Sequence, residues 1–265
     1  YEGIKNGEPP KAEISGKGFY PSLVSDVNRD GYDDMLASGA VIFGKTNLND
    51  LQTQTLTLSG IDSNNAPVGS YMVSPKEMRI ICRHYYWTNS VNYPFRTVYK
   101  DGLRLVRAWW DGNAFKSEVL DEFTVNTQDG TGLYWVSALL PQPVGKYYFV
   151  CATQILGKVE NTNLTVYDIS NDKLEKKYSQ RMDNISSFNG LSRGLDTNNM
   201  PSLCINQYNT LGERIFHIYN VNISNFLHEI AQFKMTEFIN LPLTGLISLP
   251  DITGDGKSGI ALSNR

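Results

Sequence analysis

The feature that most constrains the fold of this chain is a strand–turn–strand pattern that recurs five times. Each copy opens on a small or aromatic residue, runs through a short apolar strand and a polar turn, and ends in a second apolar strand. The copies begin near Phe19, Gly69, Gly132, Gly190 and Gly245. Spacings of about 50–60 residues are typical of architectures in which every repeat forms one small sheet.

A second hairpin follows each of the first four copies, which gives four strands per repeat. These hairpins begin near Val41, Val106, Leu164 and Phe216. The composition agrees, because Val, Ile, Thr and Tyr recur in short runs and the chain has 15 Tyr against 4 Trp. The sequence therefore predicts an all-β fold, a β-propeller of four-stranded blades with about five blades visible, in one domain over residues 1–265. A helical period longer than a turn or two occurs only from Phe226 to Phe238.

The two ends of the chain leave the size of the ring open. Residues 1–17 read as a partial blade, and the fifth copy stops after its first hairpin. In one interpretation the ends share a blade and close a five-bladed ring, which removes free sheet edges. In the other, the chain is an excerpt from a larger ring, which the missing strand between Arg265 and Tyr1 favours. A first residue of Tyr rather than Met also indicates a processed chain or a fragment.

Residues 26–34 place oxygen donors at alternate positions around a glycine. The donors at positions one, three, five, seven and nine are Asp26, Asn28, Asp30, the carbonyl of Tyr32, and Asp34. Gly31 at position six allows a tight turn because it has no Cβ. Ca²⁺ binds about six to eight oxygens, and a short loop supplies them in this pattern. The loop therefore predicts a Ca²⁺ site.

Two other interpretations of this loop are an EF-hand and a solvated turn. An EF-hand needs a Glu at position twelve and flanking helices, whereas position twelve is Ala37 and both flanks read as short strands. A solvated turn needs no metal, because Asp, Asn and Gly favour turns on their own. Three carboxylates and an amide at regular spacing favour the metal over that turn.

A second, weaker Ca²⁺ site is predicted in the fifth copy. Its donors would be Asp251, Thr253, Asp255 and the carbonyl of Lys257. Thr stands at the third position and Gly259 at the ninth, so one carboxylate is gone and the affinity should fall. The middle three copies keep the strand pattern and lose the donors.

The segment from Val24 to Gly44 resembles the FG-GAP/VCBS repeats, the calcium-bearing β-propeller repeats of integrin α-subunit heads and of many secreted proteins. The resemblance rests on Asp26-Val-Asn-Arg-Asp-Gly-Tyr-Asp-Asp34 followed by Val41-Ile-Phe-Gly44. The resemblance extends over the strand pattern of most of the chain. It implies a bound metal ion at only one or two of the loops. It implies structural ions within blades and a non-catalytic propeller that mediates adhesion or protein assembly.

The same resemblance implies an extracellular or cell-surface location. Extracellular modules bind Ca²⁺ at about 10⁻⁴–10⁻³ M, so millimolar Ca²⁺ would fill the site and cytosolic Ca²⁺ would not. Three sequons, at Asn163, Asn184 and Asn222, would accept glycans in a secreted eukaryotic chain. The net charge of −3 comes with no basic block, which excludes a nucleic-acid surface, and no apolar run approaches the about 18–20 residues of a membrane span. The partners we expect are a protein or a surface glycan.

The sequence gives little support for a catalytic site. Gly190-Leu-Ser192-Arg-Gly194 fits the G-x-S-x-G pattern, but it aligns with the first strands of the other copies and no helix follows. His84, His217 and His228 lack ligand spacing, so we expect strand or loop residues. The three cysteines, Cys82, Cys151 and Cys204, recur at one place in successive copies and predict buried thiols rather than disulfides.

The aromatic clusters offer a candidate contact surface and an alternative function. Tyr85, Tyr86, Trp87 and Tyr93 lie in a predicted insertion between strands, and loops on rigid scaffolds often carry recognition. Aromatics beside Asn and Ser suit a sugar or a protein partner, so the alternative is a carbohydrate-binding propeller, either a lectin or the recognition domain of a polysaccharide-active enzyme. Trp109-Trp110 is predicted to alternate across a strand, with one ring packed between blades.

Overall fold

The computed structural model describes most of the chain from residue 22 onward. The described residues are 22–23, 26, 28, 30–37, 40–45, 52–55, 65–89, 96–126, 131–142, 145–155, 158–191, 201–222, 226–234, 243–249, 253–255 and 259–264. The N-terminal partial blade predicted for residues 1–17 lies outside them.

Every regular element in the described residues is a β-strand. The first eight are β1 (Ser22–Leu23), β2 (Met35–Ala37), β3 (Ala40–Phe43), β4 (Gln52–Thr55), β5 (Asn65–Ser74), β6 (Glu77–Asn89), β7 (Arg96–Trp110) and β8 (Phe115–Asn126). The next eight are β9 (Thr131–Gln142), β10 (Lys146–Ile155), β11 (Lys158–Asp168), β12 (Glu175–Arg181), β13 (Ile185–Leu191), β14 (Ser202–Tyr208), β15 (Arg214–Asn222) and β16 (Phe226–Lys234). The last two are β17 (Leu243–Leu249) and β18 (Gly259–Asn264).

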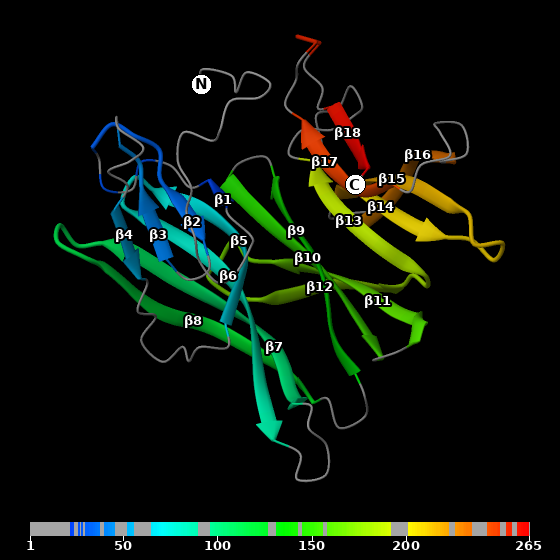
Figure 1. The fold of residues 1–265 in the computed structure, drawn as a ribbon, viewed down its shortest axis with the longest axis horizontal. Helices are drawn as coiled ribbons and strands as arrows, with labels where there is room; N and C mark the ends of the chain where they lie inside the picture. The colour runs from blue at the N-terminus through cyan, green and yellow to red at the C-terminus, as the bar shows by residue number, and fades with distance from the viewer. Residues whose placement is uncertain are drawn as a thin grey trace. The chain divides into compact units, whose positions relative to one another are not determined.

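The strands form successive antiparallel sheets in which chain neighbours pair (Figure 1). Four sheets have four strands each, β1–β4, β5–β8, β9–β12 and β13–β16, and β17 pairs with β18. Short polar turns permit this meander; in the turn between β7 and β8, for example, Gly112 adopts a φ of 107° that suits glycine. All five predicted repeats therefore fold as antiparallel hairpins, and the all-β prediction is confirmed. The propeller arrangement and the closure of a ring remain predictions.

The chain divides into two compact units, residues 1–85 with 103–122, and residues 86–102 with 123–265. In the first unit, β3 and the parts of β6, β7 and β8 that belong to this unit share one apolar core. Its buried members are Val41, Phe43, Met78, Ile80, Cys82, Val106, Ala108 and Phe115. The Trp110 ring packs against it edge-on, 5.7 Å from the Phe43 ring centroid. The alternation predicted for Trp109-Trp110 is confirmed, because Arg107 instead lies over the Trp109 ring on the other face.

In the second unit, the sheets β9–β12 and β13–β16 share the larger apolar core. Its buried members are Leu140, Tyr148, Val150, Ala152, Leu164, Val166, Met182, Ile185, Leu203, Ile205, Tyr219 and Val221. The first strands of three successive sheets also lie side by side, since β13 contacts both β9 and β17.

The three cysteines occupy the positions that the repeats predict. Cys82, Cys151 and Cys204 lie in β6, β10 and β14, the second strands of successive sheets, and all three are buried and unbridged. Burial raises the pKa of each thiol to about 12. The prediction of buried thiols without disulfides is confirmed.

Phe226 begins strand β16, which pairs with β15 as the second hairpin of the fourth copy predicts, so the helical period noted from Phe226 does not become a helix over residues 226–234. Two local predictions are wrong. The insertion predicted from Tyr85 is a strand as far as Asn89, since β6 continues beside the long strand β7. The first strand of the fourth copy begins at Ile185, before the predicted Gly190, and ends at Leu191.

No helix in the described part of the chain is long and apolar enough to cross a membrane.

The packing of the second unit predicts unequal costs for two identical substitutions. Leu203 is 0 % exposed in the core, whereas Leu211 is 81 % exposed at the turn between β14 and β15. Leu203→Ala should lower the free energy of unfolding by about 2–5 kcal/mol, because it leaves a cavity. Leu211→Ala should change it by less than about 0.5 kcal/mol. Urea unfolding measures both, and equal costs would contradict the assigned core.

Candidate metal centre

The loop between β1 and β2 is organised around the carboxylate of Asp26. The N–H of Asp30 donates to Asp26 Oδ1 at 3.1 Å, and the N–H of Gly31 donates to Asp26 Oδ2 at 2.9 Å. Gly31 has a φ of 94°, in the left-handed region that glycine adopts without strain. Both predictions for this stretch, a tight turn at Gly31 and short flanking strands, are confirmed.

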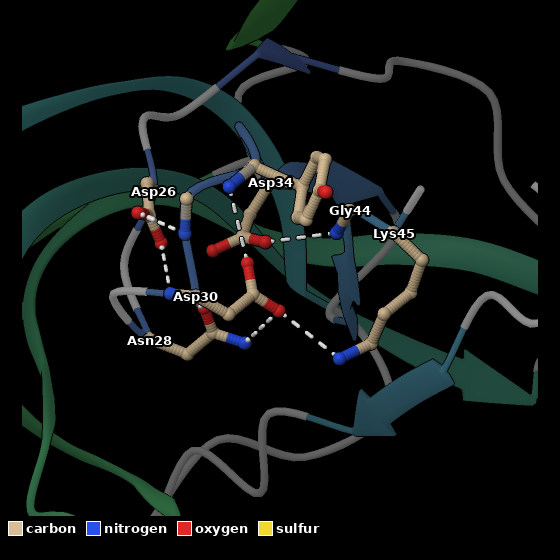
Figure 2. Close-up of polar contacts among 8 residues, drawn as sticks. Asp26, Asn28, Asp30, Asp34, Gly44 and Lys45 are labelled. Carbon is tan, nitrogen blue, oxygen red and sulfur yellow. Dashed lines mark hydrogen bonds and ion pairs between the residues drawn. The ribbon is translucent and has the colours of Figure 1, made fainter. Parts of the chain in front are cut away.

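Asn28 and Asp30 complete the turn (Figure 2). The side-chain oxygen of Asn28 accepts a second bond from the N–H of Asp30 at 3.1 Å, and its amide nitrogen donates to Asp30 Oδ2 at 3.1 Å. The N–H of Tyr32 donates to Asp30 Oδ1 at 3.1 Å. Figure 2 shows the side chains of Asp26, Asn28, Asp30 and Asp34 directed toward the inside of the loop. The spacing in the sequence thus brings Asp26, Asn28 and Asp30 to one turn, with Asp34 following it.

A cationic side chain meets the loop at Asp30. The Lys45 ammonium lies 3.0 Å from Asp30 Oδ2. Desolvation acts to raise the pKa of Asp30, but the hydrogen bonds from Lys45, Asn28 and Tyr32 outweigh it and hold that pKa below its usual value. Asp30 is therefore a carboxylate at neutral pH, as a metal ligand must be.

Asp34 ties the loop to the sheet. This side chain is 0 % exposed, and its Oδ1 accepts a 2.9 Å hydrogen bond from the N–H of Gly44, directly after β3. A Cβ at residue 44 would collide with the carbonyl oxygen of Asp33 and lie 2.8 Å from Tyr32 Cβ, so only glycine fits there. The loop and the end of β3 are thus in direct backbone contact.

The donor set of this loop fits a hard cation in its chemistry. Carboxylate, amide and carbonyl oxygens are the ligands that Ca²⁺ prefers, and the set contains no nitrogen or sulfur donor. In the described residues, no three His, Cys, Asp or Glu side chains gather as a metal-binding group. The loop instead combines two acids, Asp26 and Asp30, with the Asn28 amide, while Asp34 bonds to Gly44.

The predicted second site is described only in part. Thr253 and Asp255 are exposed, and Gly254 between them has a φ of 77°, which indicates a tight turn. Asp251 and Lys257 lie outside the described residues. The second site therefore stays a prediction.

The predicted contact surface is described only through its backbone. Tyr85, Tyr86 and Trp87 lie in β6, and nothing is described of their side chains, while Tyr93 lies outside the described residues. These residues therefore stay a predicted surface.

Two of the sequons have described side chains. Asn163 is exposed on β11, and Asn184 is half-buried at a turn, with a φ of 60°. Asn222 ends β15. Their glycosylation stays a prediction.

Of the G-x-S-x-G motif only the first two residues are described: Gly190 and Leu191 end strand β13, in agreement with the prediction of a strand there, and Ser192 lies outside the described residues. The Nδ1 atom of His217 on β15 lies 3.1 Å from Oε2 of Glu229 on β16. His228 is exposed on β16, and His84 is buried on β6.

The sequence reasoning missed two residues of the loop's surroundings, Gly44 and Lys45. Gly44 appeared only as part of the Phe-Gly motif, and Lys45 is 15 residues from Asp30 along the chain. The spacing within the loop gives no signal for either, because β3 brings them there through strand pairing with β2.

The sequence matches no family model and no curated protein.

The bond between Asp34 and Gly44 predicts a difference between two adjacent acids. Asp34→Ala leaves the Gly44 N–H without this acceptor, so we expect the free energy of unfolding to fall by about 1–3 kcal/mol. Asp33→Ala, at an exposed position, is the matched control and should cost less than about 0.5 kcal/mol. Urea unfolding in excess EGTA keeps metal binding out of the comparison. Equal effects would show that the Asp34 bond does not hold the loop.

Proposed function

We propose that this chain is a non-catalytic, Ca²⁺-stabilised β-propeller that mediates adhesion or protein assembly outside the cytoplasm. The observation that carries the proposal is the β1–β2 loop, in which Asp26, Asn28 and Asp30 are held by hydrogen bonds around Gly31. The ion would be held by Asp26, Asn28, Asp30, the Tyr32 carbonyl and Asp34. When bound, it would neutralise carboxylates that otherwise repel one another.

The burial of the central strands supports blades over a two-layer sandwich. Adjacent residues on a strand point to opposite faces, and in a sandwich one face of each sheet meets solvent. Here neighbouring pairs are 0 % exposed in three sheets: Ile80 and Ile81, Phe149 and Val150, and Leu203 and Cys204. Sheets covered on both faces are what stacked blades require.

The arrangement of first strands supports the same architecture. The first strands of successive blades line the middle of a propeller and so lie next to one another. The contacts of β13 with β9 and β17 have this pattern within the second unit. Repeated meander sheets of this kind give a rigid scaffold whose turns are free to contact a partner.

The location follows from the expected strength of the site. A loop with few acidic ligands should bind Ca²⁺ at about 10⁻⁴–10⁻³ M, a range that extracellular Ca²⁺ fills. At ten times the dissociation constant, one site adds about 1.4 kcal/mol to the stability of the fold. Such an ion would be a structural part of a secreted or cell-surface protein.

Thermal unfolding tests the proposal. Wild-type protein in about 2–5 mM Ca²⁺ should melt about 2–4 °C higher than in excess EGTA. Asp30→Ala should abolish this difference, because it removes a central ligand. No Ca²⁺-dependent rise in the wild type, or the same rise in Asp30→Ala, would overturn the metal site.

Asp111→Ala is the matched control. Asp111 also accepts two backbone bonds, from Asn113 and Ala114 at 2.9 Å each, and pairs with Lys116 at 2.7 Å. Its loss should lower the melting temperature equally in Ca²⁺ and in EGTA. The control thus separates the loss of a turn from the loss of a ligand.

A further inference from the structure

We propose that Lys45 is a built-in competitor for the cation site, an ammonium that holds Asp30 in the Ca²⁺-free loop and must leave when a dication binds. This inference rests on the proposed Ca²⁺ site and adds its regulation. Lys45 would set the Ca²⁺ concentration at which the loop fills, and would partly neutralise Asp30 below that concentration.

The geometry places the ammonium on a proposed ligand atom. Lys45 Nζ lies 3.0 Å from Asp30 Oδ2, which also accepts the Asn28 amide at 3.1 Å, while the other oxygen of Asp30 accepts the N–H of Tyr32. Both oxygens of Asp30 are therefore engaged. A dication can reach Oδ2 only if Lys45 moves away, because two cations at one carboxylate oxygen repel each other.

The backbone delivers Lys45 to this place. It follows Gly44, whose N–H is bonded to Asp34 Oδ1 and whose position has no room for a Cβ. The chain is thus fixed against the loop one residue before Lys45. The side chain itself is 32 % exposed, so it can swing into solvent without leaving a buried charge.

Replacement of the Lys45 ammonium by a dication at Asp30 is energetically favourable. A partly exposed ion pair contributes little to stability, so a dication that meets several oxygens can replace it. Removing one positive charge about 5–6 Å from a dication should tighten binding by about 3–10-fold, given Coulomb repulsion in a highly solvated setting.

The test is a Ca²⁺ titration, with CaCl₂ as the only added ligand, followed by thermal unfolding. Lys45→Met should melt below wild type in EGTA and bind Ca²⁺ about 3–10-fold more tightly. Lys45→Gln should behave in the same way, and it serves as the readout if the Met variant does not fold. Lys45→Arg retains the charge and should keep the wild-type affinity.

Lys116→Met is the matched control, because Lys116 forms the same kind of pair with Asp111 in another turn. It should lower the melting temperature without changing Ca²⁺ affinity. Unchanged or weaker Ca²⁺ binding in both Lys45→Met and Lys45→Gln would overturn the competition while leaving the Ca²⁺ site intact. An absence of Ca²⁺ binding in wild type and variants alike would overturn the proposed site itself.

Discussion

Burial of the central strands on both faces is the constraint on which the rest of this structure depends. Phe149 and Val150 are adjacent on β10, point to opposite faces and are both fully buried. A sheet with such strands cannot leave either face in water, since each buried aliphatic or aromatic side chain contributes about 1.5–3 kcal/mol through burial. Within the β9–β12 sheet, β10 is therefore covered on both faces, and polar chemistry is left to the turns at the ends of the strands.

The β1–β2 loop shows how such a turn is attached to the apolar layers. Val41 and Phe43 on β3 belong to the core of the first unit, and Gly44 follows them directly. Through the bond from Gly44 to Asp34, the packing of β3 fixes one end of the polar loop. The Asp26 carboxylate fixes the turn itself by accepting two backbone N–H groups. Hydrogen bonds from main-chain N–H groups to the carboxylates of Asp26 and Asp34 thus order the loop without an ion.

Much of the strand pattern could be predicted from the repeats, because apolar runs separated by polar turns specify hairpins locally. The places of Cys82, Cys151 and Cys204 followed from the same repeats. Predictions failed where a distant partner decides the outcome. Strand β6 extends to Asn89 beside the long strand β7, where the sequence predicts an insertion between strands. Pairing between strands supplies hydrogen bonds that local propensity cannot anticipate.

The sequence by itself determined the all-β class, the order of the hairpins and the spacing that brings Asp26, Asn28 and Asp30 together in the β1–β2 loop. These properties depend on alternation and short-range spacing, which act within a few residues of the chain. Only the tertiary structure decided that Lys45 forms an ion pair with Asp30 and that the buried Asp34 carboxylate accepts a hydrogen bond from Gly44. Those contacts join residues 10 and 15 positions apart, because the pairing of β2 with β3 folds the chain back on itself.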